Sequence, residues 1–135
     1  VADTYYLSCI DEGAIDLRRG YFLVQLPRPV TSVADALRSL APDGVLEAEG
    51  VLRQGEYFFV PEKGKLPIGS IAKHKLIDSG HHRITDATLI PDVLYGRGTV
   101  RHTNRQHRML VLGKVWHRIY KNLAVASFPA SGRVD

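Results

Sequence analysis

Residues 94–112 read LYGRGTVRHTNRQHRMLVL, and this stretch carries the clearest strand signal in the chain. Apolar and polar residues alternate over residues 94–102, which predicts a half-buried β-strand. The alternation puts four side chains on one face of that strand: Tyr95, Arg97, Thr99 and Arg101. The polar residues 103–106 predict a turn, and residues 107–112 predict a return strand. The stretch therefore predicts an antiparallel hairpin with a basic face.

The residues that follow extend this hairpin. Gly113-Lys114 fits a two-residue turn with glycine first, and residues 115–121 (VWHRIYK) fit another strand. These signals predict a three-stranded antiparallel meander.

The rest of the chain predicts short strands and one helix. Apolar runs bounded by Gly, Pro or acidic residues predict strands over residues 4–10, 21–26, 45–48, 51–53, 56–60 and 71–77, with a turn at Gln54-Gly55. Residues 81–90 fit either a strand or a helix. Ser32 and Asp35 occupy capping-box positions before apolar residues at helical spacing, which predicts a short amphipathic helix over residues 33–41. We therefore expect an α+β fold dominated by β-structure, in which a curved antiparallel sheet or small open barrel carries one short amphipathic helix.

Length and composition place the chain in a broad class. Its 135 residues, 44% of them hydrophobic, predict a single domain over residues 1–135. Cys9 is the only cysteine, so no disulfide forms within the chain, and we expect a cytoplasmic location. No apolar run approaches the roughly 20 residues that cross a bilayer, so we expect no membrane partner.

Charge divides the chain into an acidic first half and a basic, histidine-rich second half. Residues 1–68 hold 7 Lys and Arg against 10 Asp and Glu, whereas residues 69–135 hold 11 against 4 and all six histidines. A basic surface attracts polyanions by counterion release, and aromatic side chains can stack on bases. The sequence therefore predicts a nucleic-acid-binding module that uses a basic antiparallel hairpin. The predicted contacts are Arg97, Arg101, Arg105, Arg108, Lys114 and Arg118 to phosphates, with Tyr95 and Tyr120 available for stacking.

The histidines support a second hypothesis. If residues 103–106 form a four-residue loop, His102 and His107 face each other across its mouth, close enough to share a ligand. His117 does not join them, because a turn at Gly113 puts it on the other face and a straight strand puts it roughly 33 Å away. A third ligand from His74, His81 or His82 stays open.

Together these residues leave several functions open. We expect neither a metal ion nor another cofactor. The alternative is a small histidine-dependent nuclease or hydrolase, with or without a metal ion, in which His82, His102 and His107 are the candidate catalytic residues. A third alternative is a homo-oligomeric assembly or scaffold protein, whose acidic and basic halves face each other between copies.

Overall fold

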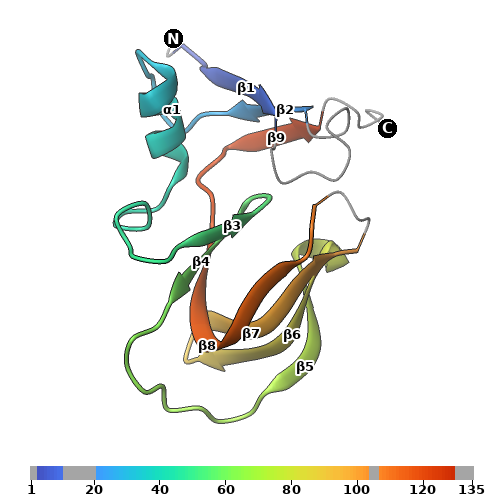
Figure 1. Cartoon of the computed structure of the whole chain (residues 1–135). Helices are drawn as coiled ribbons and strands as arrows, with labels where there is room; N and C mark the ends of the chain where they lie inside the picture. The colour runs from blue at the N-terminus through green and yellow to red at the C-terminus, as the bar shows by residue number, and fades with distance from the viewer. Residues whose placement is uncertain (1–2, 11–20, 104–106, 130–135) are drawn as a thin grey trace.

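The computed structural model describes residues 3–10, 21–103 and 107–129. It contains two antiparallel sheets and one α-helix (Figure 1). The expectation of a β-dominated α+β fold with a curved sheet is confirmed. In the part of the chain that the structure describes, no helix has the length and apolar character that a bilayer crossing requires.

The smaller sheet lies beside the helix. It has the order β1-β2-β9, in which β1 is Tyr6–Ile10, β2 is Tyr21–Gln25 and β9 is Ala126–Pro129. The helix α1 (Val33–Leu40) begins as predicted, because the Ser32 hydroxyl accepts a hydrogen bond from the backbone N–H of Asp35 at 3.0 Å. Its buried residues Ala36 and Leu40 pack against Leu7, Val24 and Leu26 of the sheet.

The larger sheet has six strands in the order β3-β4-β8-β7-β6-β5. Their bounds are Leu52–Gln54 for β3, Tyr57–Pro61 for β4, Ala72–Ile77 for β5, His82–Ile90 for β6, Val93–His102 for β7 and Leu110–Lys121 for β8. A short 3-10 helix, η2 (Asp78–Gly80), joins β5 to β6. Residues 81–90, which the sequence leaves ambiguous, thus form a central strand apart from His81.

This sheet curls so that its two ends approach each other (Figure 1). The Tyr57 ring on β4 lies 5.0 Å from the His82 ring on β6, although β8 and β7 separate these strands in the sheet. The inner face packs a core of Tyr57, Phe59, Ile84, Val100 and Leu112. The turn after β3 is thereby brought over the start of β6, and this places the site described below.

Two glycines with positive φ distort β7 and β8. Gly98 (φ +90°) lies opposite Gly113 (φ +72°), and the register shifts on either side of Gly98. The expected turn at Gly113-Lys114 is wrong, because β8 runs unbroken from Leu110 to Lys121. The glycine conformation is used for an irregularity inside a strand instead of a chain reversal.

Two further expectations are corrected. Residues 45–48 form turns in place of a strand, because their backbone bonds are local: the Val45 N–H donates to Pro42 and the Ala48 N–H donates to Val45. The β3–β4 turn is Gly55-Glu56, one residue later than expected, since Gln54 pairs with Tyr57.

Gly98→Ala should lower the free energy of unfolding far more than Gly113→Ala. A Cβ at Gly98 would lie 2.7 Å from the Thr85 Cβ, whereas a Cβ at Gly113 meets nothing within 4 Å. Both variants carry the cost of positive φ, about 1–2 kcal/mol, and the overlap adds about 1–3 kcal/mol only at Gly98. Urea unfolding measures the difference, and equal losses would contradict this account of the bulge.

Candidate metal centre

Three histidines from β6, β7 and the segment before β8 meet at one end of the curled sheet. His82 lies directly opposite His102 in the β6–β7 register. The rings of His102 and His107 lie 4.9 Å apart, and those of His82 and His107 lie 6.2 Å apart. One ring nitrogen from each of the three lies within 4.8 Å of the other two. This is the donor type and number of a three-histidine metal site.

His82 and His102 are neutral at physiological pH. Burial first, and the neighbouring histidines after it, lower the pKa of both residues to about 4. A metal ion binds the lone pair of a neutral imidazole, so no proton competes with it at pH 7. Burial has therefore prepared the donors, whereas the same histidines on a solvated strand would be partly protonated.

Asp78 fixes the orientation of His82. The Nδ1 of His82 donates to the Asp78 carboxylate at 2.8 Å, and the His82 backbone N–H donates to the same carboxylate at 3.2 Å. Because Nδ1 carries the proton, the lone pair is left on Nε2, which is buried and has no hydrogen-bond partner among the described residues. A carboxylate behind a ligating histidine is the usual outer-shell arrangement of metal sites.

Glu56 extends this arrangement. Burial first, and then a hydrogen bond with Asp78, raise the pKa of the Glu56 carboxyl above its ordinary value. Asp78 itself has φ +46°, a conformation that non-glycine residues adopt at a cost of about 1–3 kcal/mol. The fold retains this strained residue where its carboxylate contacts His82.

The β3–β4 turn covers the converging nitrogens. A Cβ added at Gly55 would lie 3.1 Å from Nε2 of His107 and 3.3 Å from Nε2 of His82. Both atoms therefore border the space that glycine leaves open. Nitrogens around a tetrahedral zinc ion lie roughly 3.3 Å apart, from Zn–N bonds of about 2.0–2.1 Å. Closing the present spacing to that value requires shifts on the order of 1 Å, and the residues fit such an ion.

The other described histidines stay outside this group. His117 is buried elsewhere, opposite Gly96, and its Nδ1 contacts the Val115 carbonyl at 2.7 Å. His74 is exposed on the edge strand β5, and the exposed His81 contributes only a ring contact 6.1 Å from His102. The structure thus brings His102 and His107 together and keeps His117 apart from them, as expected from the sequence.

The predicted nucleic-acid contacts are spread over the same sheet. Arg101, Arg108 and Lys114 are exposed, whereas Tyr95 is buried and Arg105 lies outside the described residues. The Arg118 guanidinium lies over the Tyr120 ring, 4.6 Å from its centre. Arg83, which the prediction omits, faces Arg101 across the β6–β7 pair.

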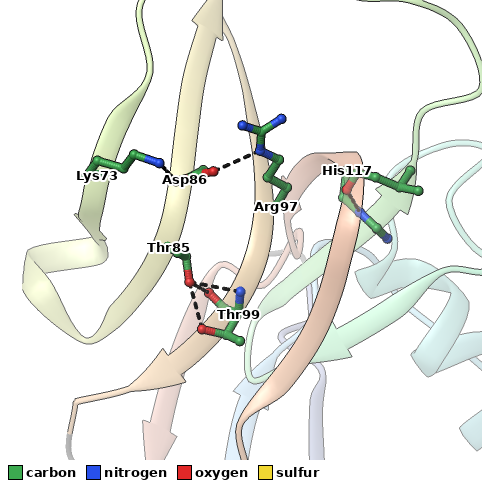
Figure 2. A network of polar contacts seen from close by, with 7 residues as sticks. Lys73, Thr85, Asp86, Arg97, Thr99 and His117 are labelled. Atoms are coloured by element: carbon green, nitrogen blue, oxygen red, sulfur yellow. Dashed lines mark hydrogen bonds and ion pairs between the residues drawn. The ribbon is translucent and has the colours of Figure 1, made fainter.

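Arg97 belongs to an ion-pair network centred on Asp86 (Figure 2). The Asp86 carboxylate accepts from Lys73 Nζ at 2.6 Å and from Arg97 Nε at 2.8 Å. The Arg97 guanidinium also lies over the Trp116 ring, 4.4 Å from its centre. These contacts tie together the four strands β5, β6, β7 and β8, so Arg97 has a structural role in the sheet.

Comparison with known proteins gives no relative: no family model, no curated protein and no solved structure matches this chain.

Asp86→Asn should lower stability by about 2 kcal/mol at neutral pH, because two charge-assisted hydrogen bonds are weakened. The loss falls mainly on the Arg97 contact, since the Lys73 side chain is 66% exposed and well screened. The Lys73 bond and then the Arg97 bond lower the pKa of Asp86 from its ordinary 3.8.

The pH dependence follows from the sign of that shift. The contribution of Asp86 is complete above pH 4 and is lost as the pH falls through its lowered folded pKa. Wild-type stability should therefore fall more steeply in acid than that of Asp86→Asn. Asp92→Asn, in the exposed β6–β7 turn, is the control, and thermal unfolding at several pH values that gave parallel curves for wild type and Asp86→Asn would contradict this role.

Proposed function

We propose that this domain binds a divalent transition-metal ion, zinc first among them, through His82, His102 and His107, and that it is a metal-dependent hydrolase. The observation that carries the proposal is the convergence of three mostly buried imidazoles, each with a ring nitrogen within 4.8 Å of the other two. The proposed metal site differs from the sequence-based expectation that no metal ion is bound. The proposed activity is the hydrolase alternative that the sequence left open.

The donor set favours catalysis over a purely structural ion. Structural zinc sites are closed by four protein ligands, whereas catalytic sites use three and keep one position for water or substrate. Among the described residues, no fourth His, Cys, Asp or Glu side chain joins the three histidines. Glu56 and Asp78 lie with His82 in a separate group, on its Nδ1 side.

Such an ion acts by lowering the pKa of a bound water. In hydrolysis, the oxygen of that water forms a bond to the phosphorus or acyl carbon of the substrate and gives up a proton. The bond to the leaving group breaks, and the leaving group takes up a proton. A phosphodiester is the first substrate to test, because it is the substrate class of the nuclease alternative.

Titration with Co²⁺ or Zn²⁺ should show one bound ion per chain, and His102→Ala should abolish binding. At a free zinc concentration 100 times the dissociation constant, the gain of about 2.7 kcal/mol should raise the midpoint of thermal unfolding by on the order of 10 °C. His107→Ala is the second variant, since His107 is only half-buried. His74→Asn, at an exposed position with φ 52°, is the control and should bind like wild type.

Hydrolysis is measured on the same samples with bis(p-nitrophenyl) phosphate. The zinc-loaded wild type should hydrolyse it, and chelator or His102→Ala should remove the activity. Binding without hydrolysis of this ester or of an acyl ester would reject the catalytic part of the proposal, and absence of binding would reject all of it.

A second candidate function, nucleic-acid binding, is favoured by the Arg83–Arg101 pair. These two exposed side chains lie directly opposite each other, and neither forms an ion pair with an acidic side chain in the described parts of the chain. Like charges in this position destabilise a sheet unless an anion neutralises them. Adjacent strand residues point to opposite faces, so the pair lies behind His82 and His102.

The double variant Arg83→Ala/Arg101→Ala should bind oligonucleotides about tenfold or more weakly, with a shallower salt dependence. Fluorescence anisotropy at two salt concentrations measures both quantities. Arg28→Ala/Arg38→Ala removes the same charge from the first half and should change little. Equal affinity of the two double variants would exclude the arginine pair as the binding site. Homo-oligomer formation stays a prediction.

A further inference from the structure

Gln54 is the only residue of β3 that is fully buried, and it reaches β7 and the segment before β8, neither of which is its neighbour in the sheet. The side chain is 4% exposed. Its Nε2 donates to the Val100 carbonyl of β7 at 3.2 Å and to the Arg108 carbonyl at 2.7 Å. One amide group therefore joins the end of β7 to the segment that leads into β8.

These carbonyls lie next to two of the three metal-binding histidines. Val100 is two residues before His102 on the same inner face, and Arg108 directly follows His107. A shift of either backbone segment moves an imidazole, so the amide holds the spacing between the two ligands. Removing such outer-shell contacts typically costs metal sites 10- to 100-fold in affinity.

The oxygen of the Gln54 amide is a second observation. Oε1 of Gln54 is buried and has no hydrogen-bond partner among the described residues, as is true of Nε2 of His82. An unpaired buried acceptor costs about 1–3 kcal/mol, so each one in a folded protein calls for an explanation. Gln54 precedes Gly55, whose open side borders Nε2 of both His82 and His107. A metal ion with a bound water supplies the missing partners for both orphaned atoms.

We propose that Gln54 is a positioning residue of this metal centre: its Nε2 fixes the spacing of His102 and His107, and its Oε1 accepts a hydrogen bond from the water on the metal. This inference rests on the proposed function, because without a metal at the three histidines there is no water to hold. With this role for Gln54, the end of β3 and the β3–β4 turn become part of the site, although neither carries a metal ligand.

The test uses the full chain and Co²⁺, whose visible absorption bands report the number and geometry of its ligands. Gln54→Met removes donors and acceptor together, and it should weaken Co²⁺ and Zn²⁺ binding 10- to 100-fold and change the bands of the loaded protein. Gln54→Glu keeps an oxygen acceptor but loses the N–H donors, so it should weaken binding while the bands stay close to those of wild type. Gln25→Met, in the smaller sheet, is the control and should bind like wild type.

The outcomes separate this inference from the proposed function. If the wild type binds neither ion, both are overturned. If the wild type binds and Gln54→Met shows wild-type affinity and bands, only the role of Gln54 is overturned. If Gln54→Met lowers the unfolding temperature of the metal-free protein but leaves the Co²⁺ bands of the loaded protein unchanged, Gln54 has only a structural role, and its role at the metal is overturned. If Gln54→Met does not fold, the nearly isosteric Gln54→Glu is the test: weaker metal binding supports the role of Gln54, and wild-type affinity overturns it.

Discussion

The candidate site depends on the register between β6 and β7, because that register decides which side chain lies opposite His82. Near the β6–β7 turn, the numbers of paired residues sum to 183, as in Leu89 with Leu94. Beyond the bulge over Gly98 and Thr99 they sum to 184, which places His82 opposite His102. Without that extra residue, the straight ladder would put Arg101 there, and the buried end of the sheet would face a guanidinium in place of an imidazole.

Curling of the sheet then supplies the remaining parts. Packing of Phe59, Ile84 and Val100 on the inner face bends the strands around a small core, and the bend carries the β3–β4 turn over the histidines. Asp78 reaches His82 from the β5–β6 connection, Glu56 approaches from the β3–β4 turn, and Gln54, at the end of β3, reaches the Val100 carbonyl of β7. Desolvation, which stabilises the core, is also the cause of the low pKa of His82 and His102. One packing arrangement thus produces both the fold and the neutral state of these two ligands.

Much of the fold follows from local signals in the sequence. The Ser32 cap and the alternation over residues 94–102 each act over a few positions, and the helix and the strand that they predict are confirmed. The closeness of His102 and His107 could also be derived, because only four residues separate them in the sequence. His82 could not be assigned to them, because its partner depends on a bulge that a two-residue alternation does not reveal. No local sequence pattern indicates a role for Gln54. Its two hydrogen-bond partners lie 46 and 54 positions further along the chain and are brought to it only when the sheet curls. The predicted turn at Gly113 was wrong because a glycine with positive φ is equally suited to a turn and to a bulge within a strand.

The most direct test of the central claim is X-ray absorption at the zinc edge of the zinc-loaded protein, which reports the identity and number of the metal's ligands. The account predicts three imidazole nitrogens and one oxygen from water around the zinc of the wild type, and no zinc bound to His102→Ala. A shell of oxygens, a shell that includes the Cys9 sulfur, or a shell unchanged by His102→Ala would show that His82, His102 and His107 do not form the metal centre.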